Sequence, residues 1–515
     1  MFRLSSKKKQ AVVDEAVKEI DKDLENTVLS RSLEKNMAML NELFTDVDVF
    51  KTKIISSVQN QKIRLGIAYC SSATDSSLIS ENIIEPLTRC PEFPENLNTI
   101  TGLTEQVIQI GEIEKTTSVA GIVEAICSGD TVVLADGEAE ALIIGTRSFP
   151  ARAVTEPENE RTLSGPREGF TESIIMNIAM LRHRVHTNKL KLKFSSLGKR
   201  TKTKICVCYI DGLVNNKILT ELNKRLSKID IDAVLDSNYI SEMIKDGAIS
   251  PFRTTGYTER PDTAVARLLE GRIALIVDGS PSVLTLPFLF IENFQSSEDY
   301  YTNYYYGSFS RLLRIFGFIL TLVVPGLYIS IVAYHHEMLP TQLLLNVAAE
   351  RSGVPLPASI EAFVMLIVFD ILRETGVRMP NNIGQALSIV GALVIGQSAV
   401  EARMVAAPMI IIVALTGITN LLVPRLSGPV IFIRYFLLLA GSLLGFYGLV
   451  LGMAAVIIHI LNLRSFGIPQ ISAAGNVRFQ EVKDIAIRAP WWQMRLRPKG
   501  LSQNRTREKT DGNGS

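Results

Sequence analysis

The chain has 515 residues, more than one hydrophobic core normally serves, and its length predicts two or three domains. Its 54 basic and 52 acidic side chains nearly cancel, so its net charge points to no partner such as nucleic acid. Hydrophobic residues make up 47% of the chain and concentrate in residues 281–470, whereas residues 1–280 resemble an ordinary soluble protein in composition. This distribution argues against a wholly soluble chain.

The N-terminal segment, residues 1–48, is expected to be helical. Five apolar side chains recur there at spacings of three and four residues and so share one helix face, which predicts a packing or self-association role: Leu29, Leu33, Met37, Leu40 and Phe44. The basic start is followed by "AVVDEAVKEIDKDLEN", which lacks the apolar core of a secretory signal. We therefore expect the soluble half to be cytoplasmic.

Residues 49–190 and 191–280 are predicted to form two related α/β subdomains. The stretch "IVEAICSGDTVVLADG" (122–137) aligns without gaps on "AVARLLEGRIALIVDG" (264–279), and each is typical of a helix, a glycine stop, a buried strand and an Asp-Gly turn. Asp136 and Asp278 would then follow equivalent strands. They either make tight turns or lie at the sheet edge where open α/β sheets bind ligands.

The sequence contains no recognisable catalytic or metal-binding motif. Five cysteines, at positions 70, 90, 127, 206 and 208, lack disulfide or metal-ligand spacing and are expected to be buried thiols. The stretch "HHEML" departs from the HExxH zinc pattern because Pro340 fills its last position. We therefore expect no enzyme activity, no metal and no cofactor.

Residues 281–473 are predicted to be an all-α, multi-pass membrane domain. The run 315–334 is long and apolar enough to span, and Arg311 and Arg314 before it indicate its cytoplasmic end. Further apolar stretches are 359–373, 383–402, 407–423 and 435–461, whereas 282–294 is too short to cross.

The tail, residues 474–515, bears on the number of crossings. Five spans starting from a cytoplasmic N-terminus would place it outside, yet its basic composition is typical of the cytoplasmic side. We therefore expect an even number of crossings, with one segment that does not cross completely. Trp491 and Trp492 fit either an interfacial anchor on anionic lipid or a disordered tail.

Small residues recur at helical spacing in two of these stretches. Such residues let helix backbones approach closely, so both stripes predict a tightly packed bundle, within one chain or between several. The first stripe is Gly384, Ser388, Ala392 and Gly396, and the second is Gly441, Gly445, Gly448 and Gly452.

The stretch "IEAFVMLIVFDILRET" (360–375) carries more charge than a lipid-facing helix tolerates. Between Glu361 and Asp370 the apolar run covers only about 12 Å, well short of a bilayer core of about 30 Å. In one interpretation Asp370 pairs with Arg373 near the cytoplasmic end. In the other, the helix lines a water-filled path, with Glu361, Asp370 and Glu374 facing it.

Glu401 and Arg403 pose the same choice between two apolar runs. A structural ion pair would assign Arg403 the same role as Arg373, whereas a water-filled path would place Glu401 with the other candidate pore carboxylates.

Several stretches together resemble one known family. They run in the same order from about residue 50 to residue 473: "EPENERTLSGPREGF", "KRTKTK", "YTERPD", "VDGSPSVLTLPFLFIENFQSSEDYY", "IGQALSIVGALVIGQSAVEA" and "LRSFGIPQIS". The chain thereby resembles the A subunit of spore germinant receptors of the GerA family. The resemblance implies an inner-membrane location in the spore, a transporter-like B subunit and a lipoprotein C subunit as partners, and assembly of several copies into a nutrient-gated ion channel.

The resemblance favours the water-lined interpretation of residues 359–374. Two other classes of function stay open at this point. A secondary transporter would need inverted repeats, which the membrane half does not show. A non-conducting scaffold of the receptor cluster would tolerate neutralised membrane carboxylates.

Overall fold

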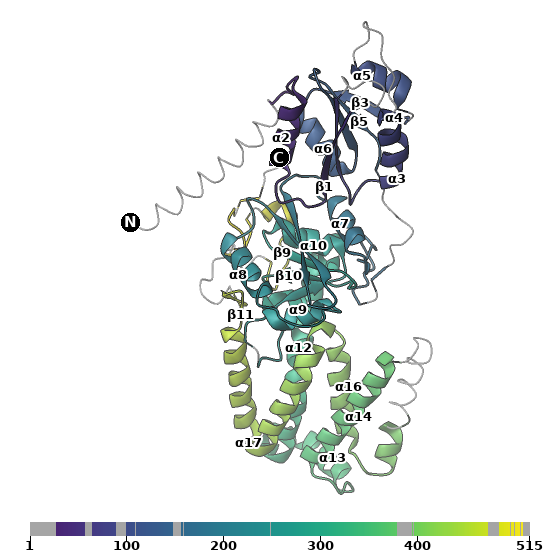
Figure 1. The fold of residues 1–515 in the computed structure, drawn as a ribbon. Coiled ribbons are helices and arrows are strands. Elements are labelled where there is room, and N and C mark those ends of the chain that lie inside the picture. Colours follow the sequence, from purple (N-terminus) through teal and green to yellow (C-terminus); the bar gives the residue numbers. More distant parts are fainter. Residues whose placement is uncertain are drawn as a thin grey trace. The chain divides into compact units, whose positions relative to one another are not determined.

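Figure 1 shows the fold of the chain in a computed structural model. The structure describes residues 27–56, 64–88, 99–108, 110–147, 156–157, 159–247, 249–378, 394, 396–471, 484–494, 496–498, 500–504 and 506–507. The chain divides into two compact units. The first holds residues up to 246, 255–288 and the C-terminal residues from 492. The second holds residues 247–254 and 289–491.

The first unit contains two five-stranded sheets with the same strand order. In the first sheet the order is β1-β2-β4-β5-β3, and in the second it is β6-β7-β9-β10-β8. The described neighbours in both sheets pair antiparallel. The strands of the first sheet are β1 (Phe50–Ser56), β2 (Arg64–Cys70), β3 (Ile113–Thr116), β4 (Thr131–Ala135) and β5 (Ala141–Ile144). Those of the second are β6 (Leu190–Leu197), β7 (Thr203–Ile210), β8 (Gly256–Thr258), β9 (Ile273–Val277) and β10 (Val283–Leu286).

Helices pack on both sheets. Those of the first subdomain are α2 (Leu33–Leu43), α3 (Ser76–Ile79), α4 (Glu85–Thr88), α5 (Thr99–Gly102) and α6 (Val119–Ser128), with π-helical turns at Ser80–Ile84 and Leu103–Val107. Those of the second are α7 (Ile174–Arg182), α8 (Asn216–Leu226), α9 (Ser237–Ile244) and α10 (Pro261–Leu269). Strands β4 and β9 are buried along their whole length, and apart from Thr131 at the start of β4 their residues are all apolar.

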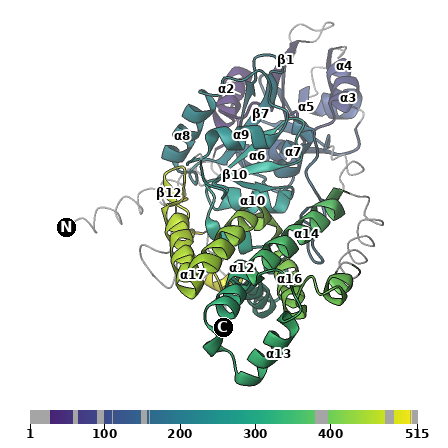
Figure 2. The same cartoon turned by 90° about the horizontal axis from the view of Figure 1, so that it is seen from below.

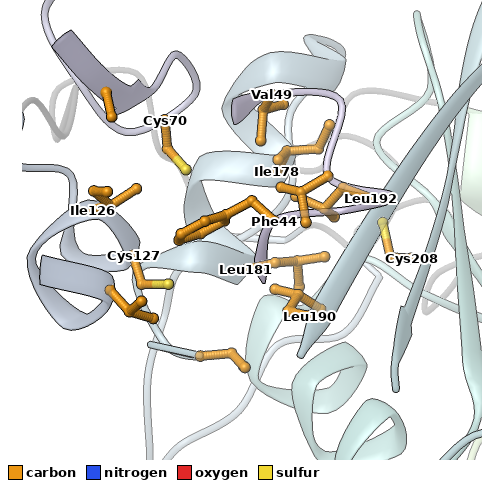
Figure 3. Packing of buried hydrophobic residues seen from close by; sticks show 14 of the residues in the cluster. Phe44, Val49, Cys70, Ile126, Cys127, Ile178, Leu181, Leu190, Leu192 and Cys208 are labelled. Carbon is orange, nitrogen blue, oxygen red and sulfur yellow. The ribbon is translucent and has the colours of Figure 1, made fainter. Parts of the chain in front are cut away.

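One hydrophobic core joins the two subdomains of this unit (Figure 3). All five apolar residues expected to share a helix face are buried in it, but the helix among the described residues 27–48 covers only Leu33–Leu43, so Leu29 precedes it and Phe44 is its C-cap. Figure 3 shows Phe44 beside Cys70, Cys127, Ile178 and Leu181, which come from both halves of the unit. Burial raises the pKa of the Cys127 thiol to about 12, so this cysteine stays a protonated core residue at neutral pH.

The two Asp-Gly sequences make turns whose carboxylates cap helices. Asp136 Oδ1 accepts a hydrogen bond from the Leu33 amide at 3.1 Å, and Asp278 Oδ1 accepts one from the Ile174 amide at 3.2 Å. Gly137 follows with a φ of +89°, which favours glycine. The tight-turn interpretation therefore holds. The ligand-edge alternative fails because the sheets are antiparallel and both carboxylates are used by the fold.

The second unit is mainly helical. Its helices are α11 (Glu298–Tyr301), α12 (Tyr304–Ala333), α13 (Thr341–Arg351), α14 (Ala358–Arg378), α16 (Ala407–Asn420) and α17 (Ser427–Asn462). Short 3-10 turns lie at Phe290–Phe294, His336–Met338, Pro424–Leu426 and Trp491–Gln493, and a two-stranded ribbon joins β11 (Arg464–Ser465) to β12 (Ile468–Pro469). The prediction of an α/β N-terminal half and a helical C-terminal half is thus confirmed at this level.

Two of the described helical stretches, 304–333 and 424–462, are long and apolar enough to cross a bilayer. Seen from below, α12 lies between α17 and α16 (Figure 2), and it packs on both. The expected span 383–402 lies largely outside the described residues, as do the expected packing residues Gly384, Ser388 and Ala392. The stripe's last member, Gly396, is buried.

Helix α17 is a hairpin and not one straight span. Gly445 has φ +62° and ψ −143°, values outside the helical region. Beyond it the chain turns back, because a Cβ placed on Gly452 would lie 2.9 Å from Leu437 Cδ2, fifteen residues earlier. The arms 427–444 and 446–462 run side by side (Figure 1), each up to about 27 Å long. The prediction of one continuous span over 435–461 is therefore wrong.

Candidate functional site

The charged helix of the sequence analysis is α14. It begins after two prolines at 355 and 357 and ends shortly before Pro380, as expected for a segment bounded by helix-breaking residues. Its inner face is apolar and packs on α12, α16 and α17. Met365 and Leu366 on that face are buried against Ile329 and Met409. Each charge on α14 therefore lies either in this packed interior or on the outer face.

Glu361 lies in the interior. Its side chain is fully buried, and Oε2 accepts a hydrogen bond from Arg351 Nη1 at 2.9 Å. The other oxygen, Oε1, accepts a 2.7 Å bond from the amide of Ala406, the residue that precedes α16. The N-terminus of a helix favours an anion. Glu361 thus fastens the end of α13 and the start of α16 to α14.

Asp370 joins α14 to the first arm of α17. Its Oδ2 accepts hydrogen bonds from Arg434 Nη2 at 2.6 Å and from the Tyr435 hydroxyl at 2.9 Å. Arg373 lies further away, with 3.9 Å between its Nη2 and Asp370 Oδ1. The expected pair with Arg373 is therefore present but loose, whereas Arg434, which is fully buried, is the closer partner.

Four apolar side chains and an ion pair form the outer face of α14. These positions lie three or four residues apart and so share one stripe: Ile360, Val364, Ile367, Ile371, Glu374 and Arg378. Each of the four apolar side chains is more than 40% exposed. Glu374 and Arg378 pair at 2.8 Å with most of both side chains exposed. This stripe is available to lipid or to another protein surface.

Glu401 and Arg403 are also exposed. Arg403 has a φ of +54°, in the left-handed region. Its side chain lies over Gly353, where an added Cβ would come within 2.9 Å of Arg403 Cδ. Of the four expected pore carboxylates, the structure thus buries Glu361, engages Asp370 and leaves Glu374 and Glu401 on the surface of the chain.

The glycine stripe of α17 serves packing inside the chain. A Cβ on Gly441 would lie 2.9 Å from the carbonyl oxygen of Gly326, so α12 and the first arm touch through their backbones. Gly448 and Gly452 bring the second arm against the first, and Gly445 makes the reversal between them.

Sequence reasoning missed two parts of this charged network. Arg434 lies one residue before the start assigned to the last span, so a lone arginine inside an otherwise apolar run was an available signal. The second part is a cluster at the start of α12. There Arg311 is fully buried and pairs with Asp299 at 3.3 Å and with Asp484 at 2.9 Å.

The cluster around Arg311 also includes Arg314, the second arginine that precedes the predicted span 315–334. Arg314 pairs with Asp299 and donates to the carbonyl oxygen of Phe294. These contacts tie the segment that follows the last helix to the beginning of α12, because Asp484 lies far along the chain. No pattern of neighbouring residues in the sequence indicates such a long-range pair.

These ion pairs allow charged side chains to lie inside an apolar helical unit. Buried arginines and carboxylates at short distance fix which helices touch, and separating them leaves an uncompensated charge. Among the residues that the structure describes, no three His, Cys, Asp or Glu side chains are grouped to hold a metal ion. The fold and this site define a two-part protein, with a duplicated α/β unit and an apolar helical unit cross-linked by ion pairs.

Comparisons with known proteins give the family. The family model described as Bacillus/Clostridium GerA spore germination protein matches residues 37–500. The chain is 40% identical over 479 residues to "Spore germination protein KA" of Bacillus subtilis, covering 92% of this chain and 88% of that protein. It is 41% identical to "Uncharacterized membrane protein YfkQ" of the same organism, over 85% of each chain. The chain therefore belongs to the GerA family of spore germination proteins.

The chain is also similar to a solved structure. The N-terminal domain of the A subunit of the Bacillus megaterium spore germinant receptor GerK3 is 29% identical, with a TM-score of 0.41, over 51% of this chain and 98% of that one.

Proposed function

We propose that this chain is the A-type subunit of a spore germinant receptor and that several copies surround a nutrient-gated cation path in the spore inner membrane. Relatives with the printed names "Spore germination protein A1" and "Spore germination protein GerLA" are 31% and 34% identical to it over most of their lengths. A transporter-like B subunit and a lipoprotein C subunit are the expected partners, and the α/β unit is expected on the cytoplasmic side.

The helical unit supports a bilayer location. Large apolar side chains are exposed along both arms of α17 and along α12, including Phe316, Phe432, Leu443 and Leu451, each more than half exposed. Exposed apolar surface on this scale marks a membrane or protein interface. Both ends of the α17 hairpin lie on one side, so a hairpin that crosses twice would return the following segment to the side from which it started. That return fits the basic tail better than one span does.

The observation that carries the proposal is the exposed stripe of α14. It presents an apolar face that ends in Glu374, while Glu361 and Asp370 point into the helix bundle and are neutralised there. We propose that copies meet along this stripe and that Glu401 and Glu374, whose pair with Arg378 lies on the exposed surface, are the carboxylates accessible to passing cations. Glu361 and Asp370 then support the path by fixing the helices, and do not line it.

Nutrient-evoked conductance across a planar bilayer tests this assignment. The wild-type chain with its partner subunits is compared with Glu374→Gln and with Glu401→Gln. Glu242→Gln, which removes an exposed carboxylate from α9 in the α/β unit, is the matched control. Loss of a carboxylate near a cation path lowers cation selectivity, so we expect a shift in reversal potential under a salt gradient for either variant and none for the control.

Two results would count against the proposal. Unchanged conductance and ion selectivity in both variants would remove these carboxylates from the path. Absence of any conductance, from a complex that still binds nutrient, would favour the scaffold role for this subunit.

A further inference from the structure

The duplicated subdomains of the first unit differ in how the chain continues beyond their fourth strand in sheet order, β5 in the first and β10 in the second. In the first subdomain the chain continues past β5, and Arg147 forms an antiparallel bridge with Thr74. The carbonyl oxygen of Thr146 accepts a hydrogen bond from the Asp75 amide at 3.1 Å. This short extension lies beside the loop that follows β2.

The equivalent loop of the second subdomain follows β7. Asp75 and Asn215 are matching positions, because each caps the helix that begins after it. Gly129 and Gly271 also match. A Cβ on the first would lie 2.5 Å from the carbonyl oxygen of Ala73, and a Cβ on the second 2.6 Å from that of Leu213. Both subdomains therefore have the same narrow site beside the loop that follows their second strand in sheet order. We call this site the slot; it lies at Ala73 and Gly129 in the first subdomain and at Leu213 and Gly271 in the second.

In the second subdomain the chain cannot fill this slot by continuing its own strand. After β10 it leaves the α/β unit, and residue 289 already belongs to the helical unit. The slot is instead occupied by the C-terminal tail, more than two hundred residues later, where Ser502 forms the antiparallel bridge with Val214. Ser502 thus takes the place that Arg147 has in the first subdomain.

The tail makes a small, specific set of contacts there. The Ser502 hydroxyl and the Gln503 amide both donate to the carbonyl oxygen of Leu213, at 2.9 and 3.0 Å. Asn215 Nδ2 donates to the carbonyl oxygen of Gly500 at 3.1 Å. Leu501, between these bonds, is only 1% exposed.

Two arginines of the tail add to this docking. Arg497 Nε donates to the carbonyl oxygen of Leu269 at 2.8 Å, and its Nη1 donates to that of Thr506 at 2.6 Å, closing the tail into a turn. Arg507 lies 3.8 Å from Glu270. Burial by itself raises the pKa of Glu270, but Arg267, Arg272 and Arg507 together hold it below its usual range.

We propose that the second subdomain carries a peptide-binding slot for a short basic turn, and that the occupant is this chain's own tail, of which the described residues 496–498, 500–504 and 506–507 make the contacts. The slot lies between the turn that follows β7 and the turn that joins α10 to β9. Because the occupant is remote in sequence and held by few contacts, it can leave and return without unfolding the sheet, as a separate strand-completing peptide does. The slot thereby anchors the C-terminal end of the chain to the α/β unit.

Peptide binding in trans tests the slot independently of ion conduction. The chain is ended after Gln493, purified in detergent and titrated into a fluorescent peptide of residues 494–508. We expect saturable binding, seen as a rise in anisotropy. The intact chain should bind the same peptide much more weakly, because its own tail occupies the slot.

Peptide variants define the contact. A Leu501→Asp peptide should bind at least about tenfold more weakly, because an ionised group replaces a buried leucine. A Thr506→Ala peptide is the matched control, since the Thr506 side chain is exposed and the contacts of this residue to Arg497 and Asn504 are made by its backbone atoms. The intact chain with Leu501→Asp should gain the ability to bind the wild-type peptide, which guards against misfolding of the shortened chain.

Several outcomes would overturn the proposal. One is failure of the wild-type peptide to bind both the shortened chain and the Leu501→Asp chain. Another is equal binding of the wild-type and Leu501→Asp peptides. The third is binding by the intact chain that is as tight as binding by the shortened one.

Discussion

Replacing Asp370 by asparagine should destabilise the helical unit far more than removing any exposed carboxylate. Arg434 is fully buried, and Asp370 is its anionic partner at 2.6 Å. Its Nε and Nη1 atoms have no hydrogen-bond partner among the described residues, and its guanidinium carbon lies 5.2 Å from the centroid of the uncharged Tyr435 ring, so Asp370 supplies the anionic charge. Breaking a buried ion pair by removing one partner costs about 3–5 kcal/mol. We expect Asp370→Asn to lower the free energy of unfolding by that amount.

The exposed pair of the same helix is the internal control. Glu374 and Arg378 also lie 2.8 Å apart, but their side chains are 59% and 78% exposed. Such i,i+4 surface pairs contribute about 0.3–0.5 kcal/mol. Glu374→Gln should therefore leave stability nearly unchanged.

The assay is unfolding of the full chain in mixed micelles by titration with sodium dodecyl sulfate, followed by far-ultraviolet circular dichroism. The double variant Asp370→Leu with Arg434→Met should recover most of the loss, because well-packed apolar residues can replace a buried pair without net cost. The reasoning is refuted by an Asp370→Asn variant within about 1 kcal/mol of wild type, or by a double variant no more stable than that single one.

Three further changes test other parts of the structure. Glu361→Gln should cost about 3 kcal/mol in the same titration, because it leaves Arg351 without its buried anion, and a cost equal to that of Glu374→Gln would contradict this. Gly445→Ala should lower the thermal midpoint by an amount equivalent to about 1–3 kcal/mol, since its φ of +62° and its closeness to Tyr334 oppose a Cβ, whereas Gly428→Ala, with open space around it, should be neutral. Glu270→Gln should destabilise the α/β unit at pH 7. The pKa of Glu270 is lowered in the folded chain, so the difference in the free energy of unfolding between variant and wild type should persist above the ordinary glutamate pKa of about 4.3. It should disappear as the pH falls below that value. A difference independent of pH between 3 and 7 would argue against the arginine cluster.

Much of the fold could be predicted from local patterns in the sequence. The α/β repeat could be aligned because each copy has the same order of helix, glycine, buried strand and Asp-Gly turn, and these signals depend on neighbouring residues. The face of the N-terminal helix could be predicted for the same reason. The structure then added a partner for each turn: Asp136 caps α2 and Asp278 caps α7, contacts that span more than a hundred residues.

Only part of the candidate site could be predicted from the sequence. The sequence showed that a helix with Glu361 and Asp370 cannot face lipid along its length, because the cost of charge in hydrocarbon is a property of residue type. It could not show which cations neutralise them. Arg351 and Arg434 reach these carboxylates only because α13, α16 and α17 fold back against α14.

The sequence by itself determined the class of each half, the repeat in the first and the family to which the whole chain belongs, because composition, periodicity and motif order are local properties that survive without coordinates. Only the tertiary structure decided the reversal at Gly445, the pairing of Asp370 with Arg434 and the docking of Ser502 beside Val214. Each of these depends on segments distant along the chain coming together, and a single sequence does not specify which distant segments will meet.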